Sequence, residues 1–147
     1  MKKNLTILAI AILGLIAFAG CSKKSSSPSY SMKATINGVS FSAANCVAVS
    51  SGGDVVIDGY SGTSSASTSF PIISFSLTGY NKTTGTFNLD RTTNFAAIDS
   101  SISAVAFSNH GTLTITTANS SVISGTFSFT CDDSTKVASG SFTAKSY

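Results

Sequence analysis

Hydrophobic and polar residues alternate along most of the chain from Tyr30 onward. A period of two places successive side chains on opposite faces of a β-strand, so the pattern predicts strands with one face on a core. The first two strands are specified best, because Asn37-Gly38 suits the two positive φ angles of a two-residue type I′ turn. That turn pairs apolar residues across the hairpin: Ile36 with Val39, Ala34 with Phe41 and Met32 with Ala43.

Further strands are expected at residues 54–59, 73–78, 86–90, 102–108, 112–117, 123–131 and 138–145. Asn109-His110-Gly111 is interpreted as a three-residue hairpin loop between two of them. The segment Phe95–Ile98 fits either one helical turn or a strand, and the pattern leaves both open. In the last two strands the expected inward residues are Ile123, Gly125, Phe127, Phe129 and Cys131, then Ala138, Gly140, Phe142 and Ala144.

These segments predict an all-β fold, a single antiparallel β-sandwich or small β-barrel of about 9–10 short strands over residues 30–147. Few charged residues are available to protect edge strands, which favours barrel closure or covered edges. The composition agrees with a folded domain. Only 10% of residues are charged and mean hydropathy is +0.31, whereas disordered chains combine low hydrophobicity with high net charge.

The N-terminal segment has the layout of a secretory signal peptide. Lys2 and Lys3 precede an apolar stretch of 15 residues, 5–19, which is short for a membrane span of about 20 residues. Residues 17–21 (AFAGC) then resemble a bacterial lipobox. The resemblance implies cleavage after residue 20, lipidation of Cys21 and a membrane anchor, followed by a Ser/Lys-rich flexible tether at 21–29. The alternative is an ordinary signal peptide with a chance cysteine.

Lipoprotein sorting rules, applied through the same resemblance, indicate the cellular location. Ser22 follows the cysteine where an enteric inner-membrane retention signal has Asp, and residues 22–25 (SKKS) lack the acidic cluster of some surface-exposed lipoproteins. The resemblance therefore implies an outer-membrane lipoprotein facing the periplasm. Without Lys2 and Lys3 the net charge falls from +3 to +1, and Arg91 is the only arginine, so nucleic-acid binding is not expected.

Cys46 and Cys131 would remain in an oxidising compartment, and the sequence predicts a disulfide between them. The alternation of strand faces weighs against the bond. Cys131 shares the inward face of Phe129, whereas Cys46 lies on the opposite strand face from the apolar Val47. The alternative is two separately buried thiols. A metal site formed with His110 is not expected, because the three residues lack close ligand spacing.

Candidate catalytic groups are scarce, because the sequence contains no Glu and offers six Asp and one His as general bases. His110 is interpreted as an exposed turn residue. Asp54 and Asp58 share a strand face about 13 Å apart, farther than a glycosidase carboxylate pair. Phosphate-loop and nucleophile-elbow motifs are missing from the sequence. The sequence therefore indicates a non-enzymatic protein with no cofactor and no metal.

Two further resemblances concern the exported domain. Residues 133–135 (DST) resemble a Bacteroidetes O-glycosylation pattern, which would place a glycan on Ser134. Residues 33–41 (KATINGVSF), together with strands at 111–116, 123–129 and 139–142, are similar to small uncharacterised Bacteroidetes-type outer-membrane lipoproteins. That resemblance implies a cellular location and a β-fold, and it says nothing about activity.

Two functions stay open. The first is an envelope lipoprotein that displays a β-domain for protein or glycan contact, and an exposed patch among Tyr60, Phe70 and Tyr80 would support it. The second is a lipocalin-like carrier of a small apolar ligand. A barrel interior filled by phenylalanine side chains favours the first, and a hollow interior favours the second.

Overall fold

The computed structural model describes residues 29–62, 70–101 and 103–147, and these residues form an all-β domain without helices. Because the described part of the chain contains no helix, none there could cross a membrane. The ten strands are β1 (Ser31–Ile36), β2 (Val39–Ala43), β3 (Asn45–Ser51), β4 (Asp54–Tyr60), β5 (Ile72–Leu77), β6 (Gly85–Asn88), β7 (Asn94–Ser101), β8 (Ala104–Ala118), β9 (Val122–Cys131) and β10 (Lys136–Ser146).

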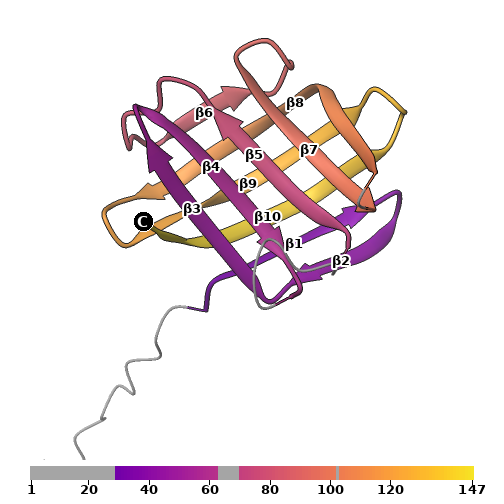
Figure 1. Ribbon diagram of the computed structural model, residues 1–147, viewed down its shortest axis with the longest axis horizontal. Helices are drawn as coiled ribbons and strands as arrows, with labels where there is room; N and C mark the ends of the chain where they lie inside the picture. The colour runs from indigo at the N-terminus through magenta and orange to yellow at the C-terminus, as the bar shows by residue number, and fades with distance from the viewer. Residues whose placement is uncertain (1–28, 63–69, 102) are drawn as a thin grey trace, which may run out of the picture.

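Seven of the strands close into a barrel in the order β10-β3-β4-β5-β7-β8-β9. In Figure 1, β3, β4, β5 and β7 form one layer, and the long strands β8, β9 and β10 cross it. A short parallel contact closes the ring, with Lys145 opposite Val47 and Ser146 opposite Ala48. The all-β fold is confirmed, and of the two expected architectures the structure has a closed barrel with additional strands.

The additional strands arise because β8 and β10 each divide one edge between two partners. β8 pairs with β7 over residues 104–107 and with β6 over residues 112–115. β10 pairs with β1 over residues 137–143 before it reaches β3. The hairpin β1–β2 therefore extends from the barrel wall, and its second strand, β2, forms one end of the sheet order.

The first hairpin has the predicted turn and register. Asn37 and Gly38 have φ angles of 49° and 83°, as a type I′ turn requires. The pairs Ile36–Val39, Ala34–Phe41 and Met32–Ala43 are all present. The turn is held against β10, because the Asn37 N–H donates to the Lys136 carbonyl and the Asn37 Oδ1 accepts from the Lys136 N–H, both at 2.8 Å.

The predicted loop at Asn109-His110-Gly111 is wrong, because β8 runs unbroken from Ala104 to Ala118. A bulge after Ser108 absorbs one residue, and His110 lies opposite Thr130 of β9. Gly111 serves close packing here. A Cβ on this residue would collide with the Cβ of Phe129 and the carbonyl oxygen of Ser128.

A second bulge changes the inward face of β10. Val137 is buried and Ala138 is exposed, whereas Ala138 was expected to face inward. The register shifts between Val137 and Gly140, and Ser139 takes a positive φ of 53°. Beyond this bulge Gly140, Phe142 and Ala144 face inward as expected. The segment Phe95–Ile98, left open by the sequence, lies within strand β7.

Phenylalanine side chains occupy the space between the two layers. The Phe75 ring lies 4.8 Å from that of Phe127, 6.0 Å from that of Phe129 and 6.3 Å from that of Phe142, measured between ring centroids. Leucine, isoleucine, valine and alanine side chains from the surrounding strands complete one continuous core. All ten strands and this core lie within residues 31–146, so the segment 29–147 contains every described structural element.

Candidate functional site

The predicted disulfide between Cys46 and Cys131 is not formed, because both residues are free thiols. Cys46 faces the core from β3 beside Ala48, which corresponds to the alternative of two separately buried thiols. Cys131 ends β9 opposite Ser108, and its Sγ donates to the carbonyl of Ala106 at 3.8 Å. The two residues sit on strands that are not paired with each other, β3 and β9.

Burial makes both thiols poor nucleophiles. It raises the pKa of Cys46 to about 12, with a further contribution from the charge of Asp58. It raises the pKa of Cys131 to about 11, with smaller contributions from Asp133 and Asp132. The thiolate is the reactive form of cysteine, so raised pKa values make both residues unreactive at neutral pH. Neither residue has the electropositive surroundings of a catalytic or redox cysteine.

The aspartates are dispersed over the fold. Asp54 accepts the N–H of Gly79 at 3.0 Å, and Asp90 caps its own turn by accepting the N–H groups of Thr92 and Thr93. Burial raises the pKa of Asp58, which the Ser74 hydroxyl partly offsets and the charge of Asp99 reinforces. Within residues 29–62, 70–101 and 103–147, no three metal-binding side chains cluster.

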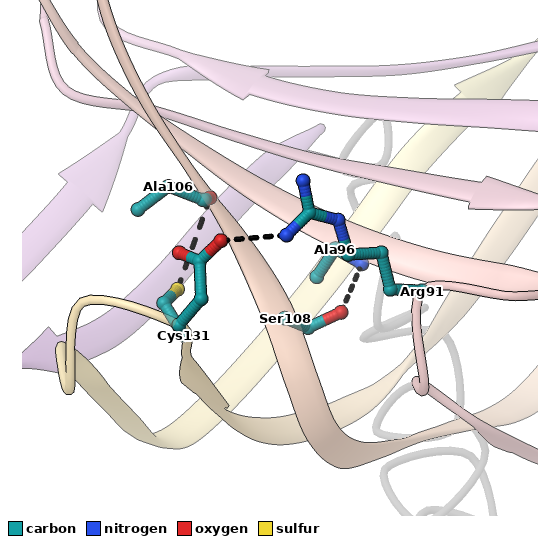
Figure 2. A network of polar contacts seen from close by, with 6 residues as sticks. Arg91, Ala96, Ala106, Ser108 and Cys131 are labelled. Carbon is teal, nitrogen blue, oxygen red and sulfur yellow. Dashed lines mark hydrogen bonds and ion pairs between the residues drawn. The ribbon is translucent and has the colours of Figure 1, made fainter.

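Figure 2 shows the polar contacts around the first half of β8. The buried Ser108 Oγ accepts the N–H of Ala96 at 2.9 Å, close to where β7 stops pairing with β8. Arg91 Nη1 lies 2.7 Å from Asp132 Oδ2, and its guanidinium stands 4.8 Å above the Phe107 ring. Both charged side chains are about half exposed, so this pair contributes little stability and joins the β6–β7 turn to the end of β9.

The turn after β9 carries Ser134, the residue of the predicted O-glycosylation. Ser134 is exposed and has a φ of 70°, and its N–H donates to the carbonyl of Cys131 at 3.0 Å. Its neighbours Asp133 and Thr135 line a cleft at this end of the barrel.

A cleft of about 580 Å³ lies between the β1–β2 hairpin, the adjoining ends of β4, β5 and β7, and the β9–β10 turn. We call it the hairpin cleft. Its apolar lining includes Ile36, Val39, Phe41, Phe70, Pro71 and Ile98. Its polar lining includes Asn37, Ser40, Ser42, Ser61, Ser100 and Thr135. Asp133 is the one charged side chain among the lining residues that the structure describes.

The hairpin cleft is held in place by contacts that the sequence does not reveal. The Ser61 hydroxyl donates to the carbonyl of Ser42 at 3.3 Å, and the Asn45 amide donates to the carbonyl of Gly62 at 2.6 Å. Sequence reasoning missed the cleft, because its walls come from four separate parts of the chain. The Asn37-Gly38 signal located the hairpin but not the surface on which it packs.

Tyr60, Phe70 and Tyr80 do not form the exposed patch that would have supported the display function. Tyr60 and Tyr80 are only 8% and 4% exposed, and the Tyr80 ring packs edge-on against Phe87. Phe70 is partly buried and belongs to the hairpin cleft. Cys21, the signal peptide at 1–20 and most of the tether at 21–29 lie outside the described residues.

Comparison with known proteins gives one match. Residues 28–144 match a family described as a domain of unknown function, DUF6252. No curated protein and no solved structure is significantly similar to the chain.

Proposed function

The chain belongs to the DUF6252 family, and we propose that it is a non-enzymatic cell-envelope lipoprotein that displays its β-barrel for contact with a protein or glycan. In this proposal a lipid on Cys21 anchors the chain to the outer membrane on the periplasmic side, as in the small Bacteroidetes-type lipoproteins that it resembles. The contact surface is the hairpin cleft.

One observation carries this proposal: the barrel interior is packed with side chains, whereas the hairpin cleft is open. Phe75, Phe127 and Phe142 are each at most 4% exposed and stack or meet edge-to-face inside the barrel. A packed interior leaves ligand contact to the outer surface. The cleft offers apolar side chains surrounded by hydroxyl groups, a combination typical of specific contact surfaces.

The direction of β1 suits display from a membrane anchor. The tether precedes Ser31, the first residue of β1, whereas Ile36 at the other end of this strand lines the hairpin cleft. Figure 1 shows the β1–β2 turn pointing away from the end at which the chain enters the barrel. The Ile36 end of the cleft is thereby separated from the point of attachment by the length of β1, whereas Ser42, opposite Lys33, lies nearer to it.

The chemistry of the hairpin cleft supports binding rather than catalysis. Its described lining residues combine one carboxylate, Asp133, with hydroxyl and amide groups and include neither an imidazole nor a thiol. His110 lies on a different surface, beside Ser128 and Lys136. Asp133 is thus the one candidate for general acid–base catalysis among these described lining residues.

A second candidate is the carrier of a small apolar ligand. The volume of the hairpin cleft, about 580 Å³, favours it, since small-molecule sites span about 300–1,000 Å³. The ligand would then lie under the hairpin and not inside the barrel. Native mass spectrometry of residues 29–147 exported to a periplasm separates the two candidates, because a carrier retains extra mass that leaves on activation.

Site-specific crosslinking in cells tests the contact surface. A photoreactive residue replacing Val39, which is 70% exposed in the hairpin cleft, should form adducts with an envelope protein or glycan. The matched control replaces Val49, which is 51% exposed on the barrel wall of β3. Identical adducts from both positions, or none from Val39, would contradict the proposal.

Lipidation and glycosylation are tested separately. Cys21→Ser should leave the chain unprocessed or release it from membrane pellets, and continued lipid labelling of this variant would exclude Cys21 as the anchor. If Ser134 carries a glycan, it would stand beside the Asp133 wall of the cleft. Ser134→Ala should then remove the added mass from protein isolated from its own host.

A further inference from the structure

We propose that the edge of β2 that pairs with no described strand binds an extended peptide segment of a partner protein by β-strand addition. This inference rests on the proposed function and names the partner class for the hairpin cleft. Strand addition needs three features: unpaired backbone groups along an edge, room for another strand beside them, and pockets for its alternate side chains.

The hairpin register identifies the unpaired backbone groups. A two-residue turn makes its flanking residues, Ile36 and Val39, a hydrogen-bonded pair, and such pairs alternate along an antiparallel ladder. Phe41 therefore bonds to β1, while Ser40 and Ser42 direct their N–H and C=O groups to the outer edge. The Ser42 carbonyl indeed accepts the Ser61 hydroxyl on that side. The Ser40 N–H, Ser40 C=O and Ser42 N–H gain no partner strand from the described residues.

The position of the hairpin cleft shows that this edge has room beside it. Residues 39–42 of β2 line the cleft without interruption. A cavity over one face of a strand would be lined by alternate residues, because successive side chains point to opposite faces. Four consecutive lining residues indicate that the cleft runs along the edge, where an added strand would lie about 4.8 Å from β2.

The cleft also specifies the side chains of the added strand. Apolar side chains on one face of the peptide would meet Val39, Phe70 and Ile98. The opposite face would lie beside the exposed hydroxyl groups of Ser40 and Ser42, which suits polar residues. Asp133 favours a basic residue near the Asn37-Gly38 end of the edge. The expected ligand is an extended segment with alternating apolar and polar residues and a terminal Lys or Arg.

The walls of the cleft favour a single extended segment over a second copy of this barrel. Phe70 and Pro71, which precede β5, and Thr135 of the β9–β10 turn wall the cleft, so that it admits one chain more readily than the edge of another sheet. The β2 sequence, VSFSA, also lacks the charged residues and prolines with which proteins usually protect an edge strand from pairing. An unprotected edge inside a walled cleft is the arrangement expected of a peptide site.

The test uses the full chain in a mild detergent and a synthetic probe. The probe is a fluorescein-labelled, capped octapeptide of alternating threonine and valine with a lysine at each end, and its binding is followed by fluorescence anisotropy. Ser40→Pro removes the outward N–H without touching the β1 ladder, and Ser40→Ala, its matched control, keeps that N–H. We expect Ser40→Pro to weaken binding about tenfold or more, with Ser40→Ala close to the wild type.

Two additional arms make the readout specific for strand addition. Two N-methylated probes are compared, because only every second N–H of an added strand faces β2. Methylation of the residues whose N–H faces β2 should abolish binding, and methylation of the alternate set should preserve it. Asp133→Asn should reduce both the affinity and its dependence on salt. Circular dichroism of each variant confirms that the barrel has folded.

The outcomes separate this inference from the proposed function. An unbound probe, equal binding by Ser40→Pro, or equal binding of the two N-methylated probes would overturn strand addition. If crosslinks from Val39 persist in the Ser40→Pro variant, the hairpin cleft is still a contact surface, but its partner is not an added strand. If crosslinks from Val39 are missing from wild-type cells, the proposed function itself fails.

Discussion

The Phe127 ring packs directly over Gly140 in the barrel interior, and substitution of these two residues tests how completely that interior is filled. The two residues are opposite each other on β9 and β10, and the phenylalanine ring covers the glycine. A Cβ added to Gly140 would overlap the ring of Phe127. The ring also lies 4.8 Å from Phe75 and 6.3 Å from Phe142, measured between centroids.

The expected cost of Phe127→Ala follows from these contacts. The ring is 4% exposed, so its loss removes a transfer term of about 1.5–3 kcal/mol and leaves a cavity inside the closed barrel. Phe→Ala changes in such sites cost about 3–5 kcal/mol. Aromatic neighbours add about 0.5–1.5 kcal/mol for each pair, so we expect a value in the upper half of that range.

Gly140→Ala supplies the second arm of a double-mutant cycle. In the wild-type background the new methyl group displaces the Phe127 ring, at a cost of about 1–3 kcal/mol from overpacking. In the Phe127→Ala background the ring is gone, and Gly→Ala should be neutral or stabilise by about 0.4–1 kcal/mol through the unfolded chain. The sign of the Gly140→Ala effect should therefore depend on Phe127.

Urea unfolding of residues 29–147, followed by near-ultraviolet circular dichroism, measures all four free energies of unfolding. A cost below about 1 kcal/mol for Phe127→Ala would show that this ring lines a cavity or the surface. Additive effects of the two substitutions would refute the packing argument, because residues in contact must couple.

Three other predictions concern polar groups. Ser108→Ala should destabilise the fold by about 1–3 kcal/mol in the same unfolding assay, because the N–H of Ala96 loses its acceptor; an effect near zero would mean that another acceptor replaces the hydroxyl. Cys46 and Cys131 should react with a thiol reagent only after unfolding, given pKa values raised to about 12 and about 11. Rapid labelling of the native chain would contradict their description as buried free thiols. So would an intact mass lower by the two hydrogen atoms that disulfide formation removes. The pKa of Asp58 is raised above 3.8 by burial, so the unfolded state binds fewer protons and the free energy of unfolding falls as pH rises from 3.8 through the folded pKa. Asp58→Asn should flatten that fall and stabilise the barrel at neutral pH, and a variant less stable than the wild type there would overturn this assignment.

Local sequence chemistry determined much of the strand content. Alternation over residues 123–131 placed Phe127, Phe129 and Cys131 on the core face, as the structure has them. Asn37-Gly38 determined both a turn and its register, because positive φ angles and cross-strand apolar pairs are local requirements. Only short-range geometry is needed for either inference.

The errors arose where a residue responds to a distant strand. Gly111 was interpreted as a turn residue, yet its missing side chain makes room for Phe129 of β9. Val137 replaced Ala138 on the inner face because a bulge adjusts β10 to its neighbours β1 and β9. Such bulges leave the composition of a strand unchanged and shift its parity, so that a period-two pattern cannot locate them.

The sequence by itself determined an all-β domain whose strands turn alternate apolar residues toward a core, because alternation and turn residues act over a few positions. Only the tertiary structure decided that the sheet closes, through Ser146 beside Ala48, and that Cys46 and Cys131 stay apart. It also decided where the edge of β2 lies relative to Phe70 and Asp133. These relations join residues up to about a hundred positions apart in the sequence, through the packing of the whole barrel. No local pattern encodes contacts over such separations.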